Sequence, residues 1–145
     1  MSEESVLIRQ YKDSDYPAVK ELYLEGDLYS EEIDSRERLK SKSEKDPESL
    51  IIAESEGKVV GSVSTIDDER FAFIFRLVVS KKYQKKGIGK KLVSAAEELL
   101  KKRKYEMIYM LVNDNDEGLL NYYEKQGYKR GQNPHRFMWK KTLKS

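Results

Sequence analysis

A run of lysines interrupted by two glycines is the part of the sequence best suited to bind an anion. It extends from Gln84 to Lys90, reads Gln-Lys-Lys-Gly-Ile-Gly-Lys, and follows an apolar stretch that ends at Val79. Glycines let a backbone approach its ligand closely, and the first N–H groups of a helix attract anions. The pattern therefore predicts a cradle for a pyrophosphate; a lysine-rich helix start, packed through its glycines, is the plainer alternative. The spacing matches neither the P-loop nor the GxGxxG dinucleotide turn.

Side chains able to do covalent or metal chemistry are scarce. The chain has no cysteine, which excludes disulfides, thiolate zinc sites and a cysteine nucleophile. Its only histidine, His135, lies near the end of the chain in a segment that reads as an exposed loop. We therefore expect no metal site, and tyrosines remain as the candidates for proton transfer.

The charged residues are divided unevenly along the chain. Residues 1–70 contain 10 Lys and Arg against 19 Asp and Glu, whereas residues 71–145 contain 18 against 7. An acidic half beside a basic half suggests two ligands of opposite sign on one domain, with solvated surface charge as the simpler explanation. The length of 145 residues predicts a single domain that spans residues 1–145.

Hydrophobic periodicity predicts alternating strands and helices. Strands are expected at 6–11, 50–53, 59–66, 71–79 and 105–112, with a final hairpin of 128–130 and 136–143. Helices are expected at 13–26, 31–45, 87–104 and 116–126. The order β-α-α-β-β-β-α-β-α-β-β indicates an α/β fold, with a mixed and mostly antiparallel sheet flanked by helices.

Two of these elements have unusual compositions. The helix at 31–45 is very polar, with only Ile33 and Leu39 to anchor it. The strand at 71–79 is nearly all apolar and is expected at the centre of the sheet. Its three phenylalanines are expected to pack in the core, with an apolar acceptor pocket as the alternative: Phe71, Phe73 and Phe75.

The chain carries no sign of a membrane or secretory address. No apolar run approaches the ~20 residues that a membrane span needs. The first ten residues do not read as a signal peptide. A cytoplasmic protein with no membrane partner is expected.

Two motifs resemble those of the GNAT superfamily of acyl-CoA-dependent N-acetyltransferases. Residues 84–89 fit its Q/R-x-x-G-x-G/A motif, and residues 77–79, Leu-Val-Val, are similar to the end of the strand before it. Residues 119–128 resemble the second signature, in which Y-E-K-x-G-F/Y closes the following helix. The predicted element order also matches, so the resemblance spans nearly the whole chain.

The resemblance implies an enzyme that moves an acetyl group from acetyl-CoA to a primary amine, by direct attack in a ternary complex. Backbone groups of Val79 would bond the pantetheine arm, and the N–H of Leu77 would polarise the thioester carbonyl. Tyr123 matches the general acid that protonates the departing thiolate. The remaining residues expected to bind coenzyme A are Val78, Gln84, Lys85, Lys86, Gly87, Ile88, Gly89, Lys90, Asn115 and Tyr122.

The chain departs from the family pattern at two places. An asparagine often begins the second signature, where the ungapped match has Asp116 and Asn115 lies one residue earlier. If Asn115 is the equivalent, Tyr122 becomes the rival acid. The glutamate base of some relatives corresponds to Phe73 here. A base must then be a water chain or one of four other carboxylates: Glu25, Asp67, Asp68 or Glu69.

Other functions and partners compete with this interpretation. A module that binds acyl-CoA without turnover is the alternative, since the strand carboxylate is missing. A nucleic-acid binder is disfavoured because the basic segments 81–91 and 101–104 lack interleaved exposed aromatics. Segment 24–32, which faces the acceptor in the resembled family, is acidic and favours a cationic amine, either a small molecule or part of a peptide. A homodimer formed through the final strand is left open.

Overall fold

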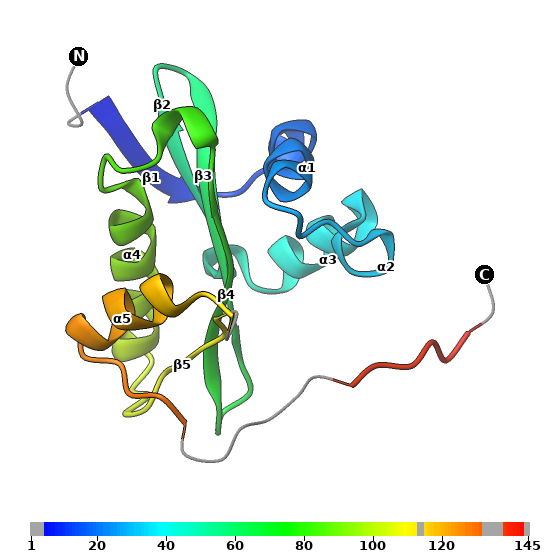
Figure 1. Ribbon diagram of the computed structural model, residues 1–145. Helices are drawn as coiled ribbons and strands as arrows, with labels where there is room; N and C mark the ends of the chain where they lie inside the picture. The colour runs from blue at the N-terminus through cyan, green and yellow to red at the C-terminus, as the bar shows by residue number, and fades with distance from the viewer. Residues whose placement is uncertain (1–4, 113–114, 132–137, 144–145) are drawn as a thin grey trace. The chain divides into compact units, whose positions relative to one another are not determined.

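Five strands form one sheet in the order β1-β2-β3-β4-β5 (Figure 1). They are β1 (Val6–Gln10), β2 (Leu50–Ser55), β3 (Lys58–Asp67), β4 (Ala72–Val79) and β5 (Tyr109–Met110). The first four are joined by antiparallel pairing, and β5 runs parallel to β4. The computed structural model describes residues 5–112, 115–131 and 138–143. The chain forms two compact units, residues 1–111 and 112–145, and the whole sheet belongs to the first.

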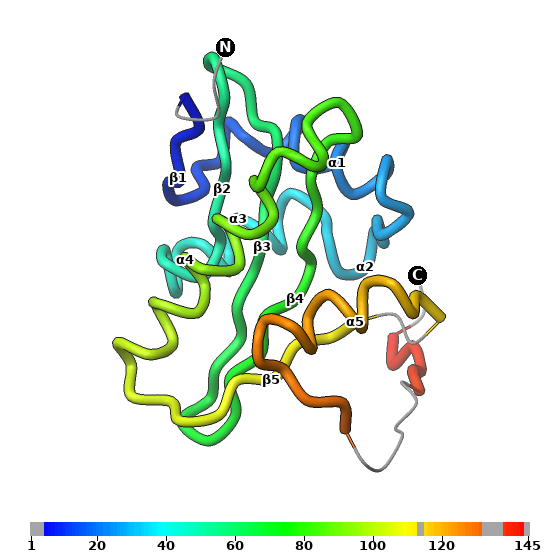
Figure 2. Tube along the Cα trace, turned by 60° about the vertical axis from the view of Figure 1, so that its left-hand side comes forward, coloured from blue at the N-terminus to red at the C-terminus, as the bar shows by residue number. Residues whose placement is uncertain are grey.

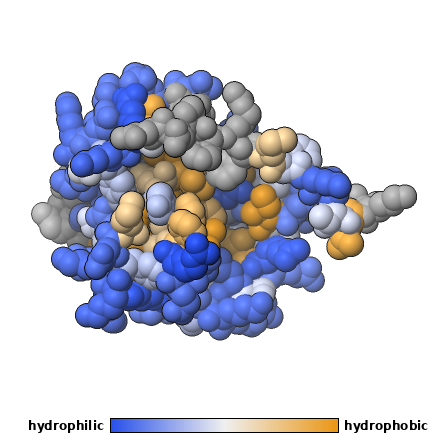
Figure 3. Space-filling view, turned by 90° about the horizontal axis from the view of Figure 1, so that it is seen from below, coloured by the Kyte–Doolittle hydropathy of each residue, from blue (hydrophilic) through white to orange (hydrophobic). Residues whose placement is uncertain are grey.

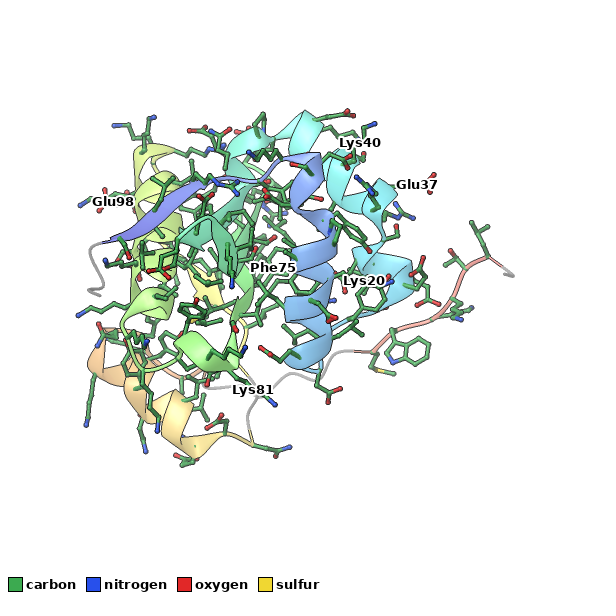
Figure 4. All side chains as sticks on the ribbon, turned by 90° about the horizontal axis from the view of Figure 1, so that it is seen from above. Lys20, Glu37, Lys40, Phe75, Lys81 and Glu98 are labelled. Atoms are coloured by element: carbon green, nitrogen blue, oxygen red, sulfur yellow. The ribbon has the colours of Figure 1, made fainter. Side chains whose placement is uncertain are left out.

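Helices of the first unit cover both faces of the sheet. α1 (Tyr16–Glu25), α2 (Glu31–Asp34) and α3 (Arg36–Lys45) lie on one face and α4 (Ile88–Lys102) on the other. Figure 4 shows the same division, with Lys20 and Glu37 on the side opposite Glu98. Across the described ranges, no helix is both long and apolar enough to cross a bilayer.

An apolar stripe runs along α4, the helix predicted at 87–104. Its apolar residues recur at helical spacing, which places them on the face turned to the sheet. The buried ones are Ile88, Leu92, Val93, Ala96, Leu99 and Leu100. On the opposite face, α1 and α3 contribute Val19, Leu22, Tyr23 and Leu39 to a core with β2 and β4. Burial on both faces fixes β4 between two layers of helices.

Gly61 of β3 lets α4 approach the sheet closely. A Cβ at this position would lie 3.0 Å from Cδ1 of Leu92 and 3.1 Å from the carbonyl oxygen of Val78. We expect Gly61→Val to lower the free energy of unfolding by about 1–3 kcal/mol, because the carbonyl belongs to a strand and cannot move aside. Urea denaturation measures this change. An unchanged urea midpoint would show that α4 moves away from β3 with no loss of stability.

The predicted helix at 31–45 is two helices. The chain breaks at Ser35, whose hydroxyl accepts the Arg38 N–H at 3.3 Å and caps α3. Leu39 is buried as expected, but Ile33 is 56% exposed and Asp34 is buried instead. Hydrophobicity predicted Ile33 as the anchor, but the buried residue is Asp34, because its carboxylate forms an ion pair with Arg76.

The strand predicted at 105–112 is wrong in extent, since β5 has only two residues. Tyr105 is held at the β3–β4 turn: its hydroxyl donates to Asp67 at 2.9 Å and accepts the Glu69 N–H at 2.9 Å. Tyr109 and Leu111 are exposed rather than buried. The tube in Figure 2 shows β5 at the far side of β4 from β3. The chain therefore runs along β4 only briefly.

The second unit contains α5 (Glu117–Lys125), close to the helix predicted at 116–126. Asp116 caps its start by accepting the Leu119 N–H at 3.0 Å. At its end the N–H of Tyr128 donates to the Tyr123 carbonyl at 3.0 Å, and Gly127 has a φ of +101°. This is the glycine-dependent helix end that the sequence predicts.

The final hairpin is not found in the residues that the structure describes. Neither 128–131 nor 138–143 forms a strand. Arg130 instead turns back to α5, where it contacts Glu117 at 2.6 Å and Glu124 at 3.1 Å. These ion pairs hold the segment after Gly127 on the helix rather than in a ladder. His135 lies outside the described residues.

Candidate functional site

The edge of β4 that faces β5 is open along most of its length. The two strands pair only at Phe73 and Ile74, and the Leu111 N–H reaches the Ile74 carbonyl at 3.4 Å. In the described part of the chain, residues 75–79 have no strand partner on this side. Because backbone N–H and C=O groups require partners, an extended ligand can add itself here like a strand.

A β-bulge lies beside this opening. The β3–β4 register shifts between Phe75 and Val78, so that Arg76 and Leu77 together oppose the single residue Val63. Arg76 has a φ of +57°, in the left-handed region that usually requires glycine. A bulge leaves one residue outside the ladder and redirects its neighbours. Leu77, the predicted N–H donor, therefore stands where the regular ladder is interrupted.

The residues predicted to hold phosphate form the passage from β4 to α4. The Gln84 side chain donates to the Val79 carbonyl at 3.0 Å, which ties the loop to the end of the strand. Gly87, with a φ of +82°, is the N-cap of α4, and no side chain caps this helix. Lys91 makes the first bond back to Gly87, at 3.1 Å. Three N–H groups ahead of it lack an intrahelical acceptor: those of Ile88, Gly89 and Lys90.

This helix end is unobstructed and positively charged. A Cβ on Gly87 would meet no atom within 4 Å, so the backbone at the helix start is open on this side. The flanking lysines are exposed, beginning with Lys81 at the start of the loop (Figure 4). Free N–H groups, the helix dipole and these ammonium groups all favour an anion. The residues therefore fit a pyrophosphate.

The second predicted motif lies on α5 and places its two tyrosines in different surroundings. Tyr123 is 7% exposed, whereas Tyr122 is 40% exposed. Their rings contact edge to face, with centroids 5.1 Å apart. Asn115 lies before the helix, whereas Asp116 is its cap. The neighbours on this helix are thus not equivalent, as their 100° separation predicts.

Three of the four carboxylates considered as bases have other partners: Glu25, Asp67 and Asp68. Glu25 accepts the backbone N–H of Lys81 at 2.9 Å. Asp67 accepts bonds from Arg103 and Tyr105, both at 2.9 Å. The backbone N–H groups of Phe71 and Arg70 lower the pKa of the Asp68 carboxyl below its ordinary value.

Position along the sheet also counts against the carboxylates at 67–69. Asp67 pairs with Ala72, at the end of β4 opposite to Val79. A rise of about 3.3 Å per residue separates Ala72 from Leu77 by roughly 15 Å. This separation disfavours Asp67 as a base that acts directly at Leu77.

Phenylalanines at the start of β4 form a surface cluster rather than a closed core. Phe73 stacks on Phe71, with ring centroids 6.2 Å apart, and contacts the tilted ring of Tyr109 at 5.4 Å; Phe71, which precedes the strand, is exposed. Figure 3 shows hydrophobic residues gathered among charged ones on the underside of the molecule. Core packing was the wrong expectation for Phe71. Farther along the strand, α3 places the Lys42 ammonium over Phe75, at 5.6 Å from the ring centroid.

An ion pair beside the bulge was missed by the sequence analysis. Arg76 contacts Asp34 of α2 through two nitrogens, at 2.8 and 3.2 Å. Arg76 is the only charged residue in the strand predicted at 71–79. A charge inside an apolar strand requires an opposite charge nearby, and this was the signal that could have indicated the pair.

Comparison with known proteins places this architecture in a family. The chain matches the model of the acetyltransferase (GNAT) family over residues 13–128, which include both motifs. An acetyltransferase of Pectobacterium atrosepticum is 29% identical to it over 121 residues, 83% of this chain and 86% of that protein.

Solved structures share the fold at low sequence identity. The PaiA N-acetyltransferase of Thermoplasma acidophilum, in complex with coenzyme A, has a TM-score of 0.75 and 21% identity, covering 90% of this chain and 93% of its own. An aminoglycoside acetyltransferase from an uncultured soil metagenomic sample, in complex with sisomicin, has a TM-score of 0.72 and 21% identity, covering 98% and 99%. The expected mixed sheet flanked by helices is thus confirmed. The chain belongs to the GNAT family of acetyltransferases.

Proposed function

We propose that this acetyltransferase moves the acetyl group of acetyl-CoA to a primary amine, by direct attack within a ternary complex. The observation that carries the proposal is the open edge of β4 at Leu77–Val79, which leads directly into the uncapped, lysine-flanked start of α4. An extended, anionic ligand such as coenzyme A needs both features in this order. The coenzyme A complex of the Thermoplasma relative supports the same ligand.

Each part of the first unit then has a role. Acetyl-CoA supplies an activated acetyl thioester. Val79 holds the pantetheine arm by backbone bonds, Val78 lies beside it on the strand, and residues 84–90 hold the phosphates. The N–H of Leu77 polarises the thioester carbonyl and stabilises the oxyanion that forms. The neutral amine must approach within ~3–3.5 Å of the carbonyl carbon, so orientation supplies much of the rate.

For residues of the second unit we propose the roles that the family motif gives them. Tyr123 donates a proton to the departing thiolate, and Asn115 and Tyr122 contribute to coenzyme A binding. The family match runs from residue 13 to 128 and so includes parts of both units. This supports our proposal that residues 1–145 act as one catalytic domain. Water, rather than a carboxylate at 67–69, accepts the proton of the amine.

We expect a cationic acceptor to be preferred. Segment 24–32, which runs from the end of α1 into α2, is acidic and partly exposed, with Asp27, Glu31 and Glu32 all exposed. A positive amine is attracted to such a segment, and salt weakens the attraction. Spermidine and lysine analogues should therefore show higher kcat/KM than neutral aromatic amines, and the advantage should shrink as salt is raised. A neutral aromatic amine as the best substrate would overturn this inference.

An amine-panel screen tests the function itself. Purified protein, acetyl-CoA and each amine are combined, and released thiol is measured beside the mass of the acetylated product. A product with the mass of one added acetyl group supports the enzyme. Tight binding of acetyl-CoA without thiol release across polyamines, aminosugars, lysine peptides and protein N-termini would favour the alternative, a module that senses acyl-CoA. Oligonucleotide binding is not expected. Cytoplasmic location and a homodimer stay predictions.

A further inference from the structure

The bulge of β4 is built around an unusual residue. A bulge of this type normally has glycine as its first residue, because that residue adopts a left-handed conformation. Here the position is taken by Arg76, with a φ of +57°. A side chain in this conformation is strained and persists only when the surroundings hold it. The structure must therefore contain something that holds Arg76.

The Arg76 side chain is anchored at its far end. Its Nη2 lies 2.8 Å from Oδ2 of Asp34, and its Nε lies 3.2 Å from Oδ1, which makes a two-point contact. The Asp34 side chain is 3% exposed and that of Arg76 is 19% exposed. The guanidinium also lies over the ring of Tyr23, 5.7 Å from its centroid. Bonds from two nitrogens fix direction as well as distance.

Asp34 is itself held in place. Its Oδ2 accepts the Ser30 N–H at 2.9 Å, and its own N–H donates to the Ser30 carbonyl at 2.7 Å. The Tyr16 hydroxyl donates to the Asp34 carbonyl at 2.9 Å. Asp34 is therefore a fixed point: its carboxylate joins Ser30 to Arg76 of β4, and its backbone carbonyl is tied to α1.

We propose that Arg76 is a positioning residue, held by Asp34 so that the bulge presents the Leu77 N–H to the thioester carbonyl. This rests on the proposed function. The same ion pair ties the bulge to the segment that we expect to face the acceptor. The Arg76–Asp34 contact would therefore help to position both the acceptor and the thioester. Neither side chain needs to touch the substrate.

The test compares two arginines. Arg76→Lys keeps the positive charge and loses the two-point contact. Arg9→Lys is the matched control, because Arg9 contacts Asp15 through two nitrogens, both at 2.9 Å, with similar exposures of 20% and 6%. Asp34→Asn breaks the Arg76 pair from the other side, in case Arg76→Lys does not fold. Circular dichroism checks the fold of each variant.

The readouts are kcat with the best amine, acetyl-CoA affinity, and the ¹³C resonance of the bound acetyl carbonyl in carbonyl-labelled acetyl-CoA. We expect Arg76→Lys and Asp34→Asn to lower kcat by roughly 10- to 100-fold, less than the loss of a whole oxyanion donor. The carbonyl resonance should move toward its position in free acetyl-CoA, while affinity changes little. Arg9→Lys should match the wild type in all three.

Each result decides the matter. Wild-type kcat and carbonyl resonance in Arg76→Lys and Asp34→Asn would overturn the proposal while leaving the enzyme active. An equal loss in Arg9→Lys would also overturn it, since the effect would then follow from stability. A wild-type protein that neither binds acetyl-CoA nor acetylates any amine would overturn the proposed function, and the positioning role with it.

Discussion

Tyr123→Phe should lower kcat by roughly 10²–10⁴-fold, the usual share of general acid–base catalysis. The substitution removes one hydroxyl and leaves the ring, which packs edge to face with the neighbouring rings of Tyr122 and Tyr128 at 5.1 and 5.8 Å. Expelling coenzyme A as an unprotonated thiolate is unfavourable, so a nearby proton donor lowers the barrier. Steady-state kinetics with the best amine measures the loss. Acetyl-CoA affinity should change little, because the interaction matters chiefly in the transition state.

Tyr122→Phe provides the matched control for this prediction. The two residues are adjacent on α5 and lose the same atom, but Tyr122 is the exposed one. We expect Tyr122→Phe to retain nearly the wild-type kcat. If it is the impaired variant, the register of the second motif is shifted by one residue and Asn115 is its first asparagine. If neither substitution matters, the thiolate leaves unaided or through water.

Gly87→Glu should raise the Kd of acetyl-CoA by roughly 100-fold or more, which corresponds to about 2.7 kcal/mol of binding free energy. The new carboxylate would enter the space in front of the α4 N–H groups, where the phosphates are proposed to lie. It would compete for the same N–H donors and repel the anionic ligand. Isothermal titration calorimetry measures the affinity directly and requires no acceptor.

Gly57→Glu separates this effect from backbone strain. Gly57 lies in the β2–β3 turn with a φ of +78°, close to the +82° of Gly87, and a Cβ there also meets no atom within 4 Å. Both substitutions therefore carry a similar strain of about 1–2 kcal/mol. We expect Gly57→Glu to lose stability and keep the affinity for acetyl-CoA. Wild-type affinity in folded Gly87→Glu would refute the phosphate site.

Local features of this chain could be predicted because their causes are local. The apolar stripe of α4 consists of residues spaced three and four apart, and these residues are buried. The turn at Glu56 and Gly57 has φ values of +53° and +78°, as a two-residue hairpin requires. Asp116 and Gly127 bound α5 for reasons contained in the helix ends themselves. The roles of the residues in the two motifs rest instead on the family resemblance.

Features that depend on distant partners were missed. The bulge at Arg76 exists because β4 changes register against β3, and no pattern within β4 reveals the register of another strand. Asp34 is buried because an arginine 42 residues away meets it. Arg130 turns to Glu117 on α5, where alternation predicted a strand. In each case a tertiary contact decided the outcome over local preference.

The open edge of β4 has a consequence for solubility. An apolar strand with unpaired backbone groups is a template for pairing with another molecule, which is how many proteins begin to aggregate. Here the bulge interrupts the edge after Phe75, so an incoming strand cannot continue in register past Arg76. The irregularity that interrupts the ladder thereby also limits association between copies. Coenzyme A bound along that edge, as proposed, would cover it. Adding coenzyme A should therefore reduce association between copies of the protein during storage and concentration.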